Sequence, residues 1–331
     1  MEFGLYEQII NKKIENDINK ENIQIEKEEI DKEDAPRILS KYFASVLEKG
    51  LKDLRDSGCS MDEQIRFCND LITQIEDKTK KEFYNTQKIE SNGQMLYSLI
   101  NKINNITSLK TTYPIRPYYS ISEPFIFTGA NTDAQFLSEL KKEIESSNEI
   151  DFIVSFIKWS GIVIMFDDLK AFTDNGGKLR IITTTYTGST DAKAIEKLSE
   201  LKNTEIKISY NTKFTRLHAK SYIFKRKTGF SAAYVGSSNI SNAALTSGTE
   251  WNVKVTESEM KDVFNKICGT FDVYWYSEEF ETFTKGDNRK LEQALKAERY
   301  PEKNENNPYV LDIIPHPYQK RVLEKLRVER E

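Results

Sequence analysis

The feature that most constrains the fold is an alternation of two hydrophobic patterns that begins near residue 123. Short apolar runs such as EIDFIVSF, KLRIITTTY and EIKISY are typical of buried strands. Between them stand longer segments, such as AQFLSELKKEIES and GIVIMFDDLKAFTDN, whose apolar residues recur at helical spacing. Strand–helix–strand units of this kind build a mixed or largely parallel sheet with helices on both faces. We therefore predict an α/β domain with a mixed sheet over residues 123–298, mostly helical after Ser258.

The preceding residues, 1–108, carry helical signals only. Pro36 is suited to the first turn of a helix, and Ser60 can cap another helix over MDEQIRFCNDLITQIED. A further helix is expected near KEFYNTQKIESNGQMLYSLINKI. We predict an all-helical N-terminal region, a scaffold or dimerisation module, which a proline-containing connector over residues 109–122 joins to the α/β domain.

Two polar pairs stand on the next two expected strands. RLHAKSYIF alternates polar and apolar residues, so His218 and Lys220 should lie on one face of a strand. SAAYVGSSN should end a second strand with Ser237 and Asn239 on one face. If the strands pair, an imidazole, an ammonium, a hydroxyl and an amide converge. A phosphodiester needs such groups, because a nitrogen can attack phosphorus and the donors can hold its non-bridging oxygens.

The spacing of these residues resembles that of the phospholipase D (PLD) superfamily, especially its single-motif nucleases. HxK, at His218 and Lys220, is followed sixteen residues after the lysine by GSxN over residues 236–239, and Glu250 lies eleven residues beyond the asparagine. The fuller HxKxxxxD signature has Asp where this chain has Lys225, and the nuclease branch often lacks that Asp. The resemblance implies a PLD-like fold and a nuclease.

The resemblance also implies a role for each residue. In the superfamily one histidine forms a phosphohistidine, while a second protonates the leaving oxygen and then activates water. His218 is the only histidine of the expected domain, so the sequence predicts a homodimer with a shared site. Lys220, Ser237 and Asn239 would hold the non-bridging oxygens, and Glu250 would accept a hydrogen bond from the imidazole of His218. No carboxylate cluster suited to Mg²⁺ joins the motif, so neither a metal nor another cofactor is expected.

Each residue also has a simpler interpretation. A histidine in a strand is usually a surface or hydrogen-bonded residue, a lysine is usually a solvated charge, and GSSN can be a turn followed by a helix cap. The five residues together at this spacing favour catalysis.

The charge distribution favours DNA as the polyanion. The net charge is -4, yet residues 202–227 contain eight Lys or Arg against the single acid Glu205. This places positive charge around His218, where a phosphate backbone must approach. The candidate DNA-binding residues are Lys213, Arg216, Lys225, Arg226 and Lys227. For the last three, a solvated hairpin tip is an equal alternative.

The end of the chain indicates a larger protein. Residues 299–309 form a polar linker, and PHPYQKRVLEKL, within residues 310–331, resembles the opening of a superfamily 2 helicase, whose adenine-reading glutamine would be Gln319. No Walker A motif follows. The resemblance implies the front part of a PLD nuclease–helicase fusion, of the kind found among modification-dependent restriction enzymes and anti-phage proteins. ATP and Mg²⁺ are then expected only for the missing helicase part.

Other features exclude several classes. The chain has no run of eighteen apolar residues and no signal-peptide core, so a cytoplasmic protein with no membrane partner is expected. The three cysteines are far apart and only two histidines exist, which argues against zinc. Two alternatives to the nuclease stay open: a catalytically silent dimerisation and DNA-binding module that positions the helicase, and a phospholipase. Glu250 disfavours the first, and the single motif disfavours the second.

Overall fold

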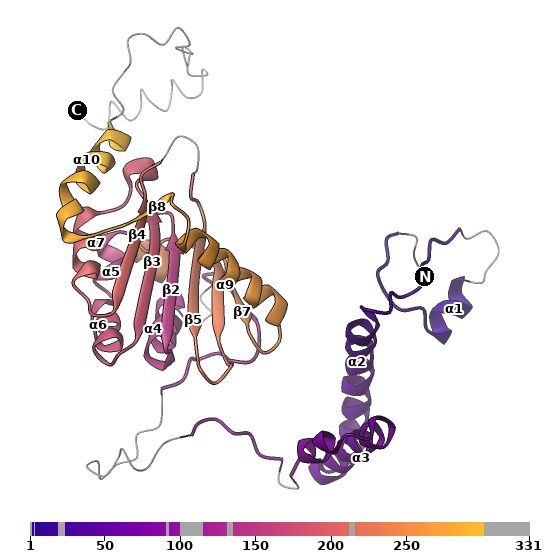
Figure 1. Cartoon of the computed structure of the whole chain (residues 1–331). Helices are drawn as coiled ribbons and strands as arrows, with labels where there is room; N and C mark the ends of the chain where they lie inside the picture. Colours follow the sequence, from indigo (N-terminus) through magenta and orange to yellow (C-terminus); the bar gives the residue numbers. More distant parts are fainter. Residues whose placement is uncertain are drawn as a thin grey trace, which may run out of the picture. The chain divides into compact units, whose positions relative to one another are not determined.

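The chain divides into two compact units, Met1–Asn101 and Lys102–Glu331 (Figure 1). The computed structural model describes residues 2, 4–18, 24–90, 93–99, 115–130, 135–211 and 216–300. Several expectations from the sequence lie outside these residues: Lys213, Gln319, the linker beyond residue 300, the helicase-like segment and residues 109–114 of the connector.

The first unit is helical, as expected. Its elements are α1 (Lys12–Ile18), α2 (Ala35–Asp56), α3 (Met61–Thr79) and the 3-10 helix η1 (Glu82–Gln87). Pro36 lies in the first turn of α2. Ser60 caps α3 through a capping box, because its Oγ accepts from the Glu63 backbone while the Glu63 carboxylate accepts from the Ser60 backbone. This confirms the expected cap.

The expectation of a further helix after α3 was wrong. Among the described residues of this stretch only η1 forms, and residues 88–90 and 93–99 are not helical. Two features explain the difference. The Asn69 side chain on α3 donates to Ile89 O at 2.9 Å and accepts from Ile89 N at 2.8 Å, which satisfies a backbone that a helix would have paired internally. Gly93 adopts a φ of 53°, in the left-handed region.

The second unit is built on an eight-stranded sheet with the strand order β1-β7-β6-β5-β2-β3-β4-β8 (Figure 1). The strands are β1 (Phe125–Phe127), β2 (Glu149–Val154), β3 (Lys178–Thr184), β4 (Thr204–Ser209), β5 (Lys220–Lys225), β6 (Ala232–Gly236), β7 (Asn252–Thr256) and β8 (Phe280–Thr282). β2, β3 and β4 are parallel, and the other neighbours pair antiparallel. The predicted mixed sheet is confirmed.

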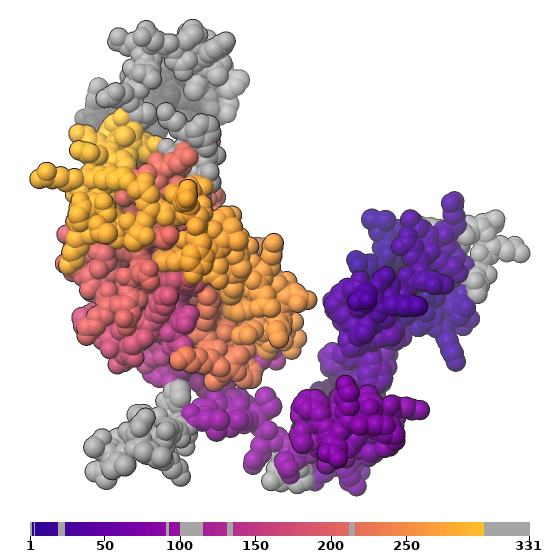
Figure 2. All heavy atoms as spheres, viewed as in Figure 1, coloured from indigo at the N-terminus to yellow at the C-terminus, as the bar shows by residue number. Residues whose placement is uncertain are grey.

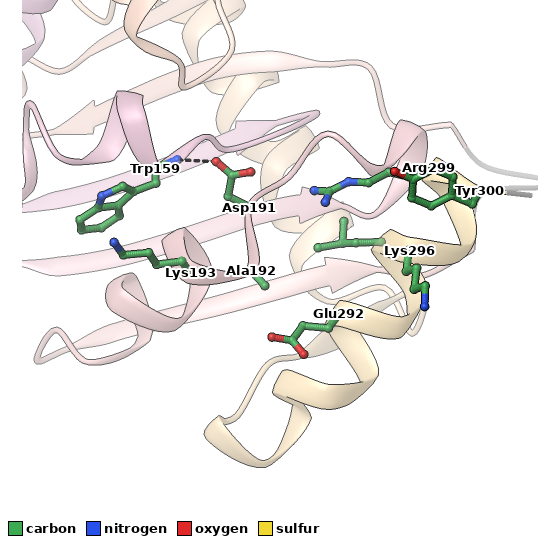
Figure 3. Close-up of a pocket in the computed structure, with 9 residues that line it drawn as sticks. Trp159, Asp191, Ala192, Lys193, Glu292, Lys296, Arg299 and Tyr300 are labelled. Atoms are coloured by element: carbon green, nitrogen blue, oxygen red, sulfur yellow. Dashed lines mark hydrogen bonds between the residues drawn. The ribbon is translucent and has the colours of Figure 1, made fainter.

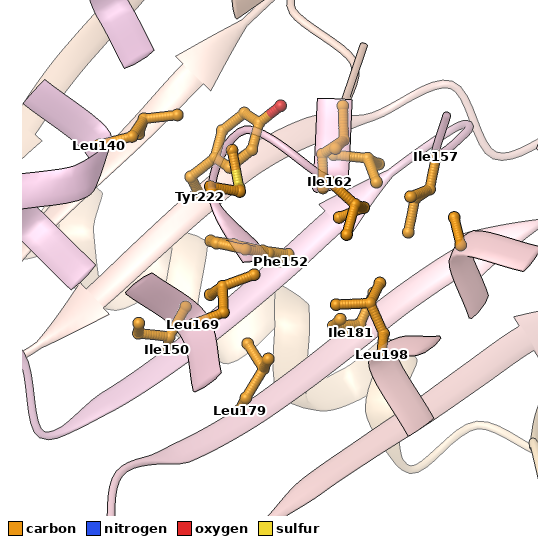
Figure 4. Packing of buried hydrophobic residues seen from close by; sticks show 14 of the residues in the cluster. Leu140, Ile150, Phe152, Ile157, Ile162, Leu169, Leu179, Ile181, Leu198 and Tyr222 are labelled. Carbon is orange, nitrogen blue, oxygen red and sulfur yellow. The ribbon is translucent and has the colours of Figure 1, made fainter. Parts of the chain in front are cut away.

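Helices cover both faces of this sheet, also as expected. They are α4 (Phe136–Ser146), α5 (Trp159–Ile162), α6 (Phe166–Asp174), α7 (Ala192–Ser199), α8 (Asn242–Thr246), α9 (Lys261–Trp275) and α10 (Asn288–Arg299), with 3-10 turns η3 (Tyr186–Gly188) and η4 (Lys285–Asp287). Alternate residues of β2 enter different cores: Phe152 packs in the larger cluster (Figure 4), whereas Ile153 packs in the cluster under α9. α9 lies across the near face in Figures 1 and 2.

Two elements differ from the sequence prediction. The segment GIVIMFDDLKAFTDN does not form one helix, since α5 ends at Ile162 and α6 begins at Phe166. The helical stretch expected after Ser258 is interrupted by β8, where Phe280 pairs with Ser209 of β4. β8 is only three residues long, so its strand pattern is too short to stand out against its helical neighbours.

A buried ionic cluster joins α4 to the sheet. Lys254 Nζ lies 3.1 Å from Glu139 Oε1 and 3.2 Å from Glu143 Oε1, and all three side chains are fully buried. Tyr234 donates its hydroxyl hydrogen to Glu143 at 2.7 Å, and Arg226 pairs with the same carboxylate. Burial raises the pKa of Glu143, but the charges of Arg226 and Lys254 outweigh it and hold that pKa below its usual value.

Candidate active site

The sheet brings the two halves of the sequence motif to one edge. β5 is antiparallel to β2 and begins opposite its end, with Lys220 beside Val154. β6 is antiparallel to β5, and β7 is antiparallel to β6, with Gly236 beside Asn252. The start of β5, the end of β6 and the start of β7 therefore share this edge. Each of the five candidate catalytic residues lies on one of these strand ends or within three residues of it.

His218 and Lys220 are in direct contact. His218 is exposed, whereas Lys220 is only 6% exposed. Lys220 Nζ lies 3.0 Å from His218 Nδ1 and donates to His218 O at 2.7 Å. Burial lowers the pKa of Lys220, and the charge of Glu250 offsets part of that lowering.

This contact bears on the tautomer of the imidazole. An ammonium can only donate, so beside a charged Lys220 the Nδ1 atom accepts and a neutral ring carries its proton on Nε2. In that tautomer Nε2–H can donate a hydrogen bond to a leaving oxygen, but transfer of the proton requires a ring that is protonated on Nδ1 as well, because a neutral ring would become imidazolate. For Nε2 to attack phosphorus, the proton must reside on Nδ1 and Lys220 must yield its place to an acceptor.

Glu250 binds Ser237 and not the imidazole. The Ser237 hydroxyl donates to Glu250 Oε2 and accepts from Trp251 N at 3.1 Å. Among the hydrogen bonds of the described residues, none joins Glu250 to His218, so the expected contact is corrected. The strand order explains the difference, because β6 lies between β5 and β7 and neighbouring strands are about 4.8 Å apart.

A steric requirement explains the glycine at the first position of the GSSN motif. A Cβ atom at Gly236 would lie 2.0 Å from Trp251 O and 2.7 Å from Asn252 Cα. The start of β7 therefore approaches β6 more closely than any side chain permits. This close approach places Glu250 beside Ser237.

Asn239 is held by the segment that follows β2. Its Oδ1 accepts from Phe156 N at 3.1 Å, which leaves the Nδ2 group as the hydrogen-bond donor of this amide. Lys158 N donates to Ile240 O at 2.7 Å, and a Cβ at Gly161 would lie 2.6 Å from Ile240 C. α5, the short helix that ends at Ile162 before α6 begins, therefore packs tightly against the residues after Asn239.

The candidate DNA-binding residues separate into two groups. Arg216 is exposed near the start of β5, with its guanidinium 5.5 Å from the ring centroid of Tyr186. Lys225, Arg226 and Lys227 lie at or beyond the other end of β5, about 17 Å along the strand at ~3.3 Å per residue.

The second group is engaged in other contacts. Lys225 Nζ lies 2.6 Å from Asp151 Oδ2, and Arg226 belongs to the buried ionic cluster around Glu143. Lys227 is exposed, and its backbone donates to Asn148 Oδ1 at 2.9 Å. The interpretation of these three residues as phosphate contacts beside the site is therefore corrected, because the turn that carries them faces the opposite edge.

Sequence reasoning missed Asn252 and a cavity beside Glu250. Asn252 is 1% exposed, and its Nδ2 donates to Ser238 Oγ at 2.8 Å, whereas its Oδ1 is buried without a partner. The cavity has a volume of about 330 Å³. Its wall includes Gly129, Gln135, Thr246, Gly248, Glu250 and Asn252. Gly129 and Gln135 stand about a hundred residues before the motif, and no local pattern connects them to it.

Two further properties concern the described residues only. No group of three or more His, Cys, Asp or Glu is arranged there to hold a metal ion. None of these helices combines the length and the apolar character that a membrane span requires.

A comparison with protein families supports this geometry. Residues 140–275 match the family model described as "Cardiolipin synthase, PLD-like domain". The chain contains a PLD-like domain. The matched range includes His218 and all of the other candidate catalytic residues. The predicted α/β fold class, with a PLD-like sheet preceded by a helical region, is thus confirmed.

The domain is similar to several solved structures. NucT from Helicobacter pylori is 19% identical, with a TM-score of 0.39 over 49% of this chain and 99% of its own. Nuc from Salmonella typhimurium, a phospholipase D family member, is 18% identical, with a TM-score of 0.38 over 49% and 100%. Phosphatidylserine synthase from Haemophilus influenzae is 10% identical, with a TM-score of 0.38 over 62% and 45%. No curated protein matches the chain by sequence.

Proposed function

We propose that the PLD-like domain is a metal-independent phosphodiesterase that cleaves DNA, with His218 as its nucleophile. The observation that carries this proposal is the 3.0 Å contact between His218 and a buried lysine at the sheet edge where the motif residues lie. An imidazole beside a cation suits attack on an anionic diester, because the lysine can turn from Nδ1 to the phosphate and offset the charge that otherwise repels a nucleophile.

The reaction has two steps. Nε2 of one neutral His218 attacks phosphorus, the bond to the leaving oxygen breaks, and a second His218, protonated on both ring nitrogens, gives its Nε2 proton to that oxygen and becomes neutral. The second imidazole then takes a proton from water, whose oxygen attacks phosphorus and breaks the P–N bond. Both histidines return to their starting states. Both roles require a proton on Nδ1, so in each copy Lys220 must turn from Nδ1 towards the phosphate.

The remaining residues stabilise the transition state in this proposal. Lys220 supplies positive charge, and Nδ2 of Asn239 donates to a non-bridging oxygen. Ser237 holds Glu250 in the resting site and can turn its hydroxyl to the phosphate. Arg216, exposed near His218, contacts the DNA backbone.

A homodimer follows from the count of histidines. The reaction needs two imidazoles, and the PLD-like domain contains only one histidine. We infer that two copies contribute one His218 each to a composite site on a two-fold axis.

The biological setting is a further part of the proposal. The helicase-like sequence over residues 310–331 supports a nuclease module within a cytoplasmic helicase-linked restriction or anti-phage protein. ATP and Mg²⁺ would serve the helicase part only. A phospholipase is disfavoured by the single HxK motif.

Cleavage of supercoiled plasmid and of a labelled oligonucleotide in excess EDTA tests this function. We expect the chain to cut and His218→Ala at equal concentration to be inactive. A folded dimer that binds DNA without cutting it would instead support the silent positioning module. Cutting by His218→Ala would contradict the proposed nucleophile.

A further inference from the structure

A second cavity lies beside α5, between α10 and the start of α7 (Figure 3). Its volume is about 400 Å³, within the range of ligand sites. The lining residues that matter here are Trp159, Asp191, Lys193, Glu292, Lys296 and Arg299. Tyr300 completes the wall at the end of α10.

The cavity is connected to the active-site edge by backbone hydrogen bonds. The segment that runs from β2 to Trp159 first anchors Asn239 through Phe156 N, and Lys158 N then donates to Ile240 O. Asp191 N donates to Ile157 O at 2.8 Å, so the start of α7 is attached to the same segment. The start of α7, which lines the cavity, is therefore attached to the same segment that holds Asn239.

The aromatic wall of the cavity is suited to a nucleobase. Trp159 packs against the core on one side, and its partly exposed ring lines the cavity on the other. Lys193 Nζ lies 4.7 Å from the centroid of this ring, and Figure 3 shows the lysine side chain directed towards it. Lys193 thus covers this ring face, and a base stacks there once the lysine turns aside to the phosphate of the same nucleotide.

The charge of the cavity is also suited to an anion. Three cations, Lys193, Lys296 and Arg299, stand against two carboxylates, Asp191 and Glu292. Asp191 is already engaged, because its Oδ2 accepts from the Trp159 backbone at 2.9 Å and its Oδ1 lies 3.5 Å from Lys158 Nζ. The lining therefore carries a net positive charge. In addition, Lys158, which is not part of the lining, offsets the charge of Asp191.

The wall of the cavity that α10 forms is held in place by hydrogen bonds from Arg299. Arg299 donates through Nε to Gly188 O at 2.6 Å and through Nη2 to Thr190 O at 3.1 Å. Carbonyl oxygens carry no net charge, so the guanidinium remains a cation at the cavity. A Cβ at Gly188 would lie 2.5 Å from Arg299 Cγ, which shows how closely α10 approaches η3.

We propose that this cavity binds one nucleotide of a single-stranded nucleic acid that extends from the active site. The base stacks on Trp159, and the flanking phosphates lie near Lys193 and Lys296. This inference rests on the proposed function, since it names a single strand as the substrate that the PLD-like domain holds.

Binding of a fluorescent 12-nucleotide single strand to the full chain tests the cavity. The measurements use the His218→Ala background in EDTA, so that cleavage does not interfere. Ala192→Phe should fill the cavity and Lys193→Glu should reverse a charge in it. Loss of one stacked base corresponds to roughly 5- to 150-fold weaker binding, and we expect a rise in Kd within this range for both variants.

The matched control is Lys266→Glu, an equal change of charge on an exposed lysine of α9, which covers the other face of the sheet. It should change the Kd less than about twofold at 0.15 M salt. Equal weakening by the two lysine variants, unchanged binding by Ala192→Phe, or no binding by the parent would overturn the proposal.

A small diester separates this proposal from the proposed function. Bis(4-nitrophenyl) phosphate needs the active site but is too short to extend along a strand path. If the unmutated chain hydrolyses it while the cavity variants bind the oligonucleotide normally, the cavity proposal alone fails. If the chain does not hydrolyse it while those variants weaken binding, the proposed catalysis alone fails.

Discussion

The Ser237 hydroxyl donates a hydrogen bond to Glu250 Oε2. This bond lies close to the paired residues Gly236 and Asn252, where β6 ends and β7 begins. The carboxylate is thereby held next to the serine, two residues before β7 begins. Its negative charge still acts on Lys220, where it raises a pKa that burial lowers more strongly. Glu250 thus affects the site through its charge even though it does not bind the imidazole.

The lowered pKa of Lys220 predicts an alkaline limit of activity. The ammonium is present below its pKa and is lost as the pH rises through it, so hydrolysis should fall at a pH below the lysine value of 10.5. Glu250→Gln removes a charge that raises this pKa, so the limit should move to still lower pH. Lys220→Arg should be slower but should lose the alkaline fall. A pH–rate profile of each variant checks this, and an unmoved limit in Glu250→Gln would contradict the assignment.

Gly236→Ala should disturb the site without removing a functional group. Its Cβ would lie 2.0 Å from Trp251 O, so β7 must shift and the Ser237–Glu250 bond must change. We expect activity to fall by about tenfold or more and Tm to drop. Gly269→Ala in α9 is the matched control, because a Cβ there has no neighbour within 4 Å. The control should retain activity with an unchanged or higher Tm. Equal behaviour of the two variants would refute the steric role of Gly236.

Lys254→Met should destabilise the second unit by about 3–5 kcal/mol, because it leaves Glu139 and Glu143 buried without their shared cation. Removing this charge should also raise the pKa of Glu143, whose ionised form stabilises the fold above its unfolded pKa and ceases to do so as the pH falls. Acid unfolding should therefore begin at higher pH. Urea denaturation at two pH values measures both effects. Lys290→Met, in an exposed pair with Glu281, is the control and should change little.

An active site shared between two copies predicts the activity of dimers that combine one unmutated copy with one His218→Ala copy. If each site needs His218 from both copies, dimers with one His218→Ala copy are inactive. Equal mixtures of the two chains, allowed to exchange, should retain about one quarter of the activity, whereas independent sites would retain about one half. Light scattering should give twice the chain mass of 38.4 kDa. A monomer that cuts at full rate would exclude the shared site.

The sequence was informative where a pattern is local. The strand and helix alternation predicted the mixed sheet, and the motif spacing placed His218, Lys220 and Ser237 on strand ends that the fold brings to one edge. It was uninformative where a contact depends on strand order. β6 separates Glu250 from His218, and Lys225 and Arg226 face the far edge, because neither relation follows from spacing along the chain. The cavity beside Trp159 was missed for the same reason, since α10 contributes one wall more than 130 residues later.

The most direct test of the central claim is to trap the covalent intermediate. The chain is mixed with a short oligonucleotide in EDTA, quenched under alkaline conditions that preserve phosphohistidine, and digested for mass spectrometry. We predict a nucleotidyl adduct on the peptide that contains His218, absent in His218→Ala and more abundant early in the reaction. Rapid cleavage with no adduct, or with an adduct on another residue, would contradict the account.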